Sequence, residues 1–493
     1  MNLTMVLDMA CDGFGDRIVI GTRADGLTPE QLRENARRGA DLIRGAGADS
    51  LVYIGVNGPA FPIAMFAAAT AGVPLIPLNY RLGAEQIAAL LAKHPAALVV
   101  ADPSVGASAL GARDLVDVED WLARTSATGA APGDATPTDE PAVVIYTSGT
   151  TSEPKGVLLR HHNLVSYVFS SVEFASASQD DAALMSVPPY HVAAVANVVT
   201  NLFAGRRLIV LERFTPEEWL DLVRVEEVTN ALVVPTMLSR ILESGGDTSL
   251  PSLRSLAYGG APAPLAVVER AMATWPEVDF VNAYGLTETS STVAVLSPAD
   301  HRAAAGNPDP AIRARLGSVG RVLPAVELQI RGDDGEILPA GRAGRIFLRG
   351  DQVSAEYSGI GRLVDEQGFF DTRDEGVLDA DGYLFIGGRT DDTIIRGAEN
   401  IAPAEIETVL LRHAAVLDVA VVGLPDEEWG QRIVAAVVLR DGSTATGDEL
   451  GEFVRSTLRS SKTPDMFVFW NELPRTEVGK LVRRHVVQQL QET

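Results

Sequence analysis

The chain has 493 residues, of which 46% are hydrophobic, and its 41 basic and 65 acidic side chains give a formal net charge of −24 at pH 7. This length predicts two or more domains, and the composition predicts a compact globular protein rather than a disordered one. The negative charge argues against nucleic acid or an anionic membrane as a partner, because both are bound through basic patches.

The amino terminus and the cysteine content favour a cytoplasmic protein. Cys11 is the single cysteine, which excludes an intrachain disulfide and a cysteine-based zinc site. No basic residue precedes Arg17, which is unlike a secretory signal. The apolar stretch 60–79 contains Gly72 and three prolines, so a buried helix, turn and strand explain it better than a membrane span.

The first part of the chain alternates between strand-like and helix-like segments. Strands are expected at 51–55, 73–78 and 96–101, and helices at 60–71 and 85–93. This alternation predicts an α/β fold, with parallel or mixed sheets flanked by helices in a large N-terminal domain. Residues 126–141 are rich in Ala, Gly, Thr, Pro and Asp and are predicted to form a surface connector.

The segment 147–156 follows a strand-like run at 142–146 and reads TSGTTSEPKG. Hydroxyl groups, glycines and one lysine in so short a segment are suited to holding phosphate oxygens. A Walker loop has its lysine directly after the last glycine, whereas Lys155 precedes Gly156, so the P-loop NTPase reading fails. Another phosphate-binding fold is therefore expected.

Further strands are expected at 207–211, 231–234 and 253–258, which extend the α/β pattern. After Val319 the runs become shorter and are separated by turn signals such as Asp333-Asp334-Gly335, which predicts antiparallel hairpins in a β-rich subdomain. Beyond Arg389, helices at 403–411 and 448–459 and strands at 416–422 and 433–439 predict a small α+β domain.

Five motifs, in order, resemble the adenylate-forming superfamily of acyl-CoA synthetases, carrier-protein-loading adenylation domains and luciferases. They are the loop 147–156, the segment 284–288, Asp374, the segment 388–392 and the segment 474–480. The resemblance runs from about Leu51 to Lys480. It implies an AMP-binding domain at 1–389 and a mobile C-terminal domain at 390–493 with a hinge at Asp391, although an ordinary charged turn would also explain 390–392.

The resemblance implies that ATP, Mg²⁺ and CoA, or the pantetheine of a carrier protein, are used. Lys480 would bridge the incoming carboxylate and the α-phosphate, and Glu288 would bind magnesium. Thr150 and Lys155 would help to stabilise the negative charge of the phosphates. The implied nucleotide site also includes Thr147, Ser148, Gly149, Thr151, Gly260, Ala261, Pro262, Asn282, Ala283, Tyr284, Gly285, Thr287, Asp374, Ile386 and Arg389. Alternatively, these residues form ordinary turns at strand ends or are charged side chains on the surface.

The acid pocket is expected near the run that follows Tyr190. Relatives that activate amino acids place an aspartate after an aromatic residue here, whereas this chain has His191, so an amino-acid substrate is disfavoured. His191 would gate the pocket, or it is a core histidine. The small residues 192–196 would leave space for a long or bulky apolar acid, or they pack a core. The expected pocket residues are His191, Val192, Ala196, Gly260 and Gly285.

Three positions depart from the family pattern, namely Ser152, Arg373 and Ala398, each of which replaces a glycine. Ala398 follows Gly397 in the loop that lines the thiol tunnel of relatives, and its methyl group could narrow that tunnel. Adenylation is expected to survive the other two changes. Whether the thioester half-reaction survives Ala398 stays open.

The resulting hypothesis is an AMP-forming acid:thiol ligase. It would convert an apolar, non-amino carboxylic acid to an acyl-adenylate with release of pyrophosphate, and then transfer the acyl group to CoA. One alternative is an adenylating enzyme that delivers its product to a carrier protein or a separate transferase. A luciferase-like oxidation, which shares the adenylation motifs, is a further alternative. The last is a silent nucleotide-binding homologue, and Lys480 and Glu288 argue against this last alternative. A monomer or a homodimer is expected.

Overall fold

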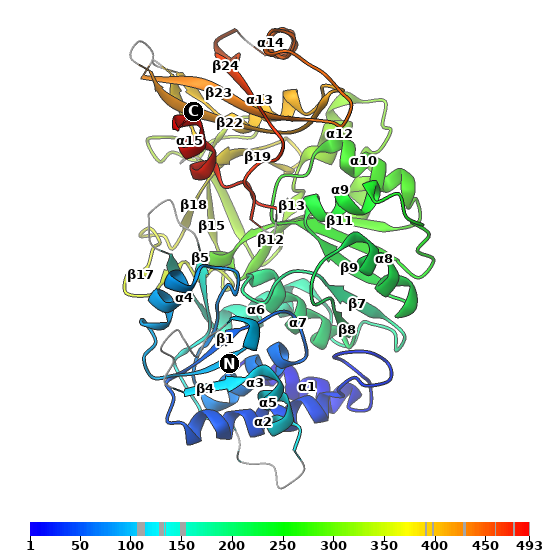
Figure 1. Cartoon of the computed structure of the whole chain (residues 1–493), viewed down its shortest axis with the longest axis vertical. Helices are drawn as coiled ribbons and strands as arrows, with labels where there is room; N and C mark the ends of the chain where they lie inside the picture. The colour runs from blue at the N-terminus through cyan, green and yellow to red at the C-terminus, as the bar shows by residue number, and fades with distance from the viewer. Residues whose placement is uncertain are drawn as a thin grey trace.

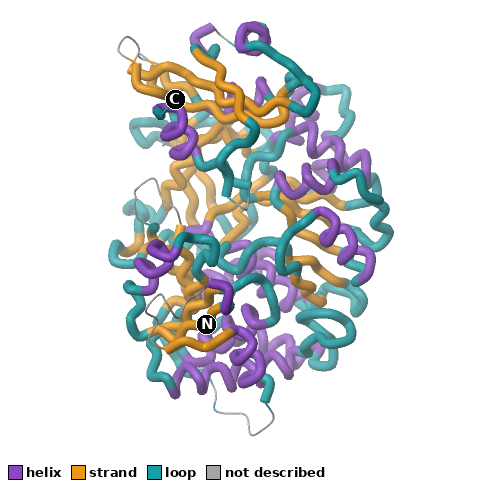
Figure 2. The backbone as a smooth tube through the Cα atoms, in the orientation of Figure 1, coloured by secondary structure: helices purple, strands orange, loops and turns teal. Residues whose placement is uncertain are grey.

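The computed structural model describes residues 1–105, 114–127, 133, 135–147, 154–389, 392–396, 399–426, 430–458, 460–476 and 479–492. The molecule is elongated, with the amino terminus in its lower half and the carboxyl terminus near its upper end (Figure 1). Two large sheets lie in the lower and middle parts, and a small sheet forms the upper end (Figure 2).

The first sheet contains the early strands predicted from the sequence. Its strands are β1 Ser50–Ile54, β2 Leu75–Pro77, β3 Ala97–Ala101, β4 Asp114–Asp117, β5 Pro141–Thr147, β6 Lys155–Arg160, β16 Glu356–Tyr357 and β17 Gly361–Arg362. The order across the sheet is β17-β16-β6-β5-β2-β1-β3-β4. Strands β1 to β5 pair in parallel, as predicted, and β6, β16 and β17 add an antiparallel edge.

The second sheet is also mixed. Its strands are β7 Ala182–Met185, β8 Arg207–Val210, β9 Asn230–Val233, β10 Ser255–Gly259, β11 Asp279–Leu286, β12 Ser291–Leu296 and β13 Arg321–Val322. The order is β13-β12-β11-β10-β9-β7-β8, with parallel pairing from β11 to β8 and antiparallel pairing at β12 and β13. The α/β fold class is therefore confirmed in both sheets.

Helices flank the two sheets. They are α1 Thr4–Phe14, α2 Pro29–Gly45, α3 Ala60–Ala71, α4 Ala84–Leu91, α5 Val118–Thr125, α6 His161–Ser171, α7 Val192–Ala204, α8 Pro216–Val225, α9 Pro235–Glu243, α10 Leu265–Thr274, α11 Pro298–Ala304 and α12 Pro310–Ala314. Every residue of α3 is buried, which confirms the prediction of a buried helix. Among the described helices, none is both long enough and apolar enough to cross a membrane.

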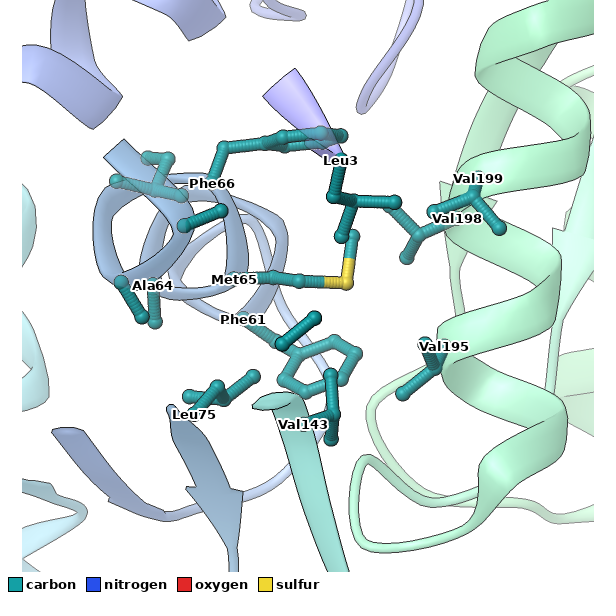
Figure 3. Packing of buried hydrophobic residues seen from close by; sticks show 14 of the residues in the cluster. Leu3, Phe61, Ala64, Met65, Phe66, Leu75, Val143, Val195, Val198 and Val199 are labelled. Atoms are coloured by element: carbon teal, nitrogen blue, oxygen red, sulfur yellow. The ribbon is translucent and has the colours of Figure 1, made fainter. Parts of the chain in front are cut away.

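Helix α3 packs against one face of α7. Val195, Val198 and Val199 of α7 point toward the side chains of Phe61 and Met65 on α3 (Figure 3). All five side chains have essentially no exposed surface. Since side chains three or four positions apart share a helix face, this contact leaves another face of α7 to meet the second sheet.

The chain after residue 319 forms antiparallel strands and then a small α+β unit, as predicted. A four-stranded antiparallel sheet contains β14 Glu327–Arg331, β15 Gly344–Arg349, β18 Phe370–Leu378 and β19 Leu384–Arg389. It is followed by β20 Ile394–Arg396, β21 Glu399–Ile401, α13 Pro403–Leu410, β22 Val416–Asp426, β23 Gly430–Leu439, α14 Gly447–Arg455, β24 Met466–Trp470 and α15 Arg483–Gln491. Two apolar clusters there consist of residues from Ile394 onward.

His161 connects the start of α6 to the amino terminus. The side chain is only 5% exposed, and its Nδ1 accepts a hydrogen bond from the Leu3 N–H at 3.1 Å. Burial, together with the positive N-terminal amine, lowers the pKa of His161 to about 4. The imidazole is therefore neutral at neutral pH, which matches its role as an acceptor.

This histidine makes stability depend on pH. Between pH 6.5 and about pH 4 the unfolded chain binds more protons at this site than the folded chain, so the free energy of unfolding falls as the pH is lowered through that window. The share of His161 is at most about 3 kcal/mol. We expect His161→Gln, which keeps an acceptor, to show a smaller loss between about pH 7 and pH 4.5 in denaturant titrations. An equal loss in His161→Gln and in the exposed-site control His485→Gln would contradict this.

Candidate active site

The predicted phosphate loop is held between two paired strands. Thr147 ends β5 and Lys155 begins β6, and the two residues are opposite each other in the antiparallel register. The Thr147 hydroxyl donates to the Lys155 carbonyl oxygen at 3.5 Å. The predicted residues Ser148, Gly149, Thr150 and Thr151 lie outside the described residues, so the structure places the two ends of the loop.

Tyr146 lies near the end of β5, directly before Thr147, and contacts two residues from an earlier part of the chain. Its hydroxyl group and His94 Nε2 are 2.8 Å apart, and the Lys93 ammonium group lies 5.8 Å from the centre of its ring. Burial raises the pKa of Tyr146 and lowers the pKa of His94. Sequence reasoning did not single out this contact, because His94 and Tyr146 lie 52 positions apart.

Glu288 is oriented by a tyrosine from a distant strand. It lies in the short turn Thr287–Thr289 after β11, and the Tyr357 hydroxyl donates to its Oε1 at 2.9 Å. The Ala355 N–H also donates to the Glu288 carbonyl oxygen at 3.0 Å. Oε2 of Glu288 has no hydrogen-bond partner among the residues that the structure describes. Tyr357 itself was not predicted from the sequence.

This arrangement fits a magnesium ion bound through one protein carboxylate. The described residues contain no cluster of three or more metal-ligating side chains. Magnesium is held in many phosphate-transfer sites by one or two carboxylates, with phosphate oxygens and water completing its shell. Glu288, with a fixed carboxylate and an available oxygen, provides a donor of this kind.

Two segments of the predicted nucleotide pocket meet at one edge of the second sheet. Strands β10 and β11 are parallel, with Gly259 opposite Ala283, so the segments 260–262 and 282–285 lie side by side. Gly260 has φ of +79°, which favours glycine. A side chain at Gly285 would overlap the Ser291 carbonyl oxygen. Asn282 donates to the Ser318 carbonyl oxygen at 3.0 Å, which ties this edge to the segment before β13.

Asp374 is brought against Tyr284. The Tyr284 hydroxyl donates to Asp374 Oδ2 at 2.6 Å, and the Asp374 N–H donates to the Thr372 hydroxyl at 3.0 Å. Arg373 has φ of +59°, a conformation that favours the glycine found at this position in the family pattern. The backbone of Arg389 lies opposite Asp374 in the β18–β19 pair, and Ile386 packs at the edge of the adjacent apolar cluster.

Lys480 lies in the segment that follows β24. Arg475 anchors the segment, since its guanidinium bonds both oxygens of Asp418 at 2.6 and 2.9 Å and donates to the Gly479 carbonyl oxygen at 2.7 Å. The segment descends from the small sheet toward α9 (Figure 1), where Gly479 meets Thr236. The Lys480 N–H donates to the Thr476 hydroxyl at 3.1 Å.

Lys480 lies within electrostatic reach of His191. Burial, with the positive charge of Lys480, lowers the pKa of His191 to about 4. His191 is half-buried and directly precedes α7. The charge of the C-terminal segment therefore acts at the start of the helix along which the acid pocket was predicted.

A cavity of about 270 Å³ lies between α7 and the second sheet. Ala193, Ala196 and Asn197 line it from the helix, and Ala257 and Ala283 line it from the strands. These helix positions alternate with the valines that face α3 (Figure 3).

The expected pocket residues lie in different parts of the structure. Ala196 lines the cavity, His191 precedes α7, and Val192 is buried in the core that includes α3. Gly260 and Gly285 lie at the sheet edge described above. The predicted hinge Asp391 and the predicted thiol-tunnel residues Gly397 and Ala398 lie outside the described residues.

Comparisons with known proteins agree along almost the whole chain. The profile for AMP-binding enzymes matches residues 7–358, and the profile for the AMP-binding enzyme C-terminal domain matches residues 405–480. A fatty acid–[acyl-carrier-protein] ligase of Streptomyces coeruleorubidus is 33% identical over 93% of this chain and 91% of its own length. An indoleacetate–CoA ligase of Aromatoleum aromaticum is 33% identical over 94% and 93%.

Among solved structures, the o-succinylbenzoate coenzyme A synthetase of Bacillus subtilis in complex with ATP and a magnesium ion superposes with a TM-score of 0.86. It is 27% identical in sequence, and the match covers 98% of this chain and 99% of that protein.

Proposed function

This chain belongs to the family of AMP-binding enzymes, the adenylate-forming acid ligases, and we propose that it activates a non-amino carboxylic acid with ATP and transfers the acyl group to the thiol of CoA. The observation that carries the proposal is the position of Lys480. The segment that bears it reaches from the small C-terminal sheet to α9, and its charge acts on His191, which directly precedes the helix that lines the cavity.

In the first half-reaction, an oxygen of the acid's carboxylate attacks the α-phosphorus of ATP. The bond between the α-phosphorus and the oxygen that bridges to the β-phosphorus breaks, and pyrophosphate leaves with the electron pair. Two anions must approach and negative charge builds up on the transferring group, so catalysis depends on positioning and charge stabilisation. Lys480 provides a positive charge between the two reacting groups. Neutral His191 adds no competing charge, in keeping with its pKa of about 4.

Glu288 would hold the metal, and the hydrogen bond from Tyr357 orients the carboxylate for that task. A magnesium ion, when bound, neutralises the charge of the phosphate oxygens. Asp374, which accepts a hydrogen bond from Tyr284, binds the ribose hydroxyls, because a carboxylate only accepts hydrogen bonds. The adenine lies against the glycine-containing segments 260–262 and 282–285. Lys155 and Thr150 contact the phosphates from the loop between β5 and β6.

In the second half-reaction, the thiolate sulfur of CoA attacks the acyl carbon, and AMP leaves with the electrons of the acyl–oxygen bond. We propose Gly397 and Ala398 as the wall of the thiol tunnel. A carrier-protein pantetheine is the alternative acceptor, which the similarity to the fatty acid–[acyl-carrier-protein] ligase favours. The alanines of the cavity support an acid with an apolar body.

We further propose that residues 390–493 form a domain that turns about Asp391 between the two half-reactions. The apolar clusters that begin at Ile394 support this boundary, because none of the described residues before Ile394 belongs to them. A cytoplasmic location is proposed because ATP and CoA are available there and a single cysteine needs no oxidising compartment.

The test is mass spectrometry of the products formed from ATP, magnesium and a panel of fatty, aryl and dicarboxylic acids, with and without CoA. We expect acyl-CoA and AMP when CoA is present. Acyl-adenylate that accumulates whether or not CoA is present would favour a carrier protein or a separate transferase as acceptor. Absence of pyrophosphate release with every acid would overturn the proposal.

Gly479 offers a test of how Lys480 is positioned. Its φ is +71°, and a β-carbon there would overlap the Thr236 hydroxyl and lie 2.8 Å from Thr236 Cγ2. We expect Gly479→Ala to displace Lys480 and to lower ATP–pyrophosphate exchange about ten- to hundredfold, since small misplacements of reacting groups cost that much.

The matched control is the double variant Gly479→Ala with Thr236→Ala. It removes the two atoms that would be closest, so part of the exchange rate should return, while the positive φ still costs about 1 kcal/mol. Thr236→Ala alone should stay near the wild-type rate. An unchanged rate in Gly479→Ala would show that this contact does not position Lys480.

A further inference from the structure

The cavity along α7 changes in character from one end to the other. Near His191 the helix presents Ala193 and Ala196, and farther along it presents Thr200 and Asn201. At 1.5 Å per residue, Asn201 lies about 12 Å along the axis from Ala193. Arg206, which follows the end of the helix, also lines the cavity. The helix therefore contributes alanines at the reacting end, where Ser291 and Thr292 of β12 also line the cavity, and a cation lies at the far end.

Arg206 is held in place but its hydrogen-bonding capacity is incompletely used. Nη1 donates to Asn201 Oδ1 at 2.9 Å, and Asn201 is fixed in turn because its Nδ2 donates to the Asn197 carbonyl oxygen at 2.8 Å. Nε of Arg206 is buried and has no hydrogen-bond partner in the part of the chain that the structure describes. Burial lowers the pKa of this guanidinium. A buried donor without a partner costs free energy, which a ligand acceptor can recover.

No carboxylate neutralises Arg206 among the described residues. Asp181 acts on it electrostatically, but the Asp181 carboxylate is itself bonded to Arg254 at 2.9 Å and accepts the Ser178 N–H at 3.0 Å. A cation that lines a ligand cavity without an ion-pair partner is suited to an anion that enters with the ligand.

We propose that Arg206 selects an acid whose apolar body carries a second carboxylate at its far end. This inference rests on the proposed function, because it assumes that the acid enters along α7 with its reacting carboxylate at the Lys480 end. The second carboxylate then accepts hydrogen bonds from the guanidinium, which Asn201 orients. The cavity of about 270 Å³ favours a compact acid over a long fatty chain.

The experiment compares matched acids that differ only at the far end. Methyl-ended, hydroxyl-ended and carboxyl-ended acids of about eight to ten carbons would span the roughly 12 Å between Ala193 and Asn201. ATP–pyrophosphate exchange gives kcat/KM for each acid without involving the thiol acceptor. We expect the dicarboxylic acid to be preferred over its methyl-ended counterpart about ten- to hundredfold, as a charge-assisted hydrogen bond allows.

Three variants assign the preference to this side chain. Arg206→Leu should reverse it, so that the methyl-ended acid becomes the better substrate, and Arg206→Lys should keep part of it because the positive charge remains. Arg213→Leu is the matched control, because Arg213 is 63% exposed and is absent from the cavity lining. It should leave the ratio unchanged.

The outcomes separate this inference from the proposed function. Exchange with methyl-ended acids but no preference for the dicarboxylic acid, or a ratio that Arg206→Leu leaves unchanged, would overturn the inference and leave the proposed function standing. A preference for the hydroxyl-ended acid alone would also overturn it. Absence of exchange with every acid would overturn both. If Arg206→Leu fails to fold, the wild-type panel and Arg206→Lys decide between the same outcomes.

Discussion

Replacement of Lys480 by alanine should abolish formation of the acyl-adenylate while leaving the fold intact. The side chain is exposed, so its loss removes little packing, whereas its charge acts on the half-buried His191 directly before α7. Removal of one group that stabilises transition-state charge typically costs a hundred- to a thousandfold in rate, or about 3–4 kcal/mol. The measurement is ATP–pyrophosphate exchange with the best acid from the panel, and the thermal midpoint should stay within about 2 °C of the wild type.

Arg484→Ala is the matched control for charge. Arg484 is another exposed cation of the same C-terminal region, at the start of α15, and its removal changes the net charge by the same amount. We expect it to retain the wild-type exchange rate. Equal losses of the exchange rate in the two variants would mean that the rate depends on the net charge of the C-terminal region and not on the position of Lys480.

Replacement of Glu288 by glutamine should be nearly as damaging, for a different reason. The amide keeps an oxygen that can accept from Tyr357, so the turn and its contact with β16 should survive. The negative charge that holds magnesium is lost. We expect the exchange rate at moderate magnesium to fall about a hundredfold and the dependence on magnesium concentration to move to higher values. Titration of the rate with magnesium is the measurement.

Tyr357→Phe separates orientation from charge. It removes the hydroxyl that donates to Glu288 Oε1 and keeps the carboxylate, so we expect a loss of about tenfold that excess magnesium restores. Glu288→Gln should not be restored in this way. If both variants respond equally to magnesium, or if Glu288→Gln keeps its rate, Glu288 is not the metal-binding carboxylate.

The sequence predicts the layered fold well because the apolar runs are long and bounded by clear breaks. The helix at 60–71 was predicted with the bounds that α3 has, since a glycine in the left-handed conformation ends it at Gly72. The antiparallel return of β6 was not predicted. Its pairing with β5 depends on a loop that the sequence marks as a phosphate motif rather than as a hairpin turn.

The candidate site is less visible from the sequence because its residues come from distant parts of the chain. The run 192–196 was treated as a single set of small residues, whereas Val192 and Val195 are buried in the core, and Ala193 and Ala196 line the cavity as well as packing with that core. That division could have been predicted from the period. Tyr357 and Arg206 could not, since each acquires its role through packing against another element.

The two faces of α7 have a consequence for how specificity can change over time. Substitutions at Ala193 or Ala196 alter the volume offered to a substrate, whereas substitutions at Val195, Val198 or Val199 disturb the buried contact with α3. A single helix thus combines cavity positions, of which Ala193 is only partly buried, with valines that serve the buried core alone. Directed evolution toward new acids can therefore sample Ala193 while the valines keep the scaffold intact.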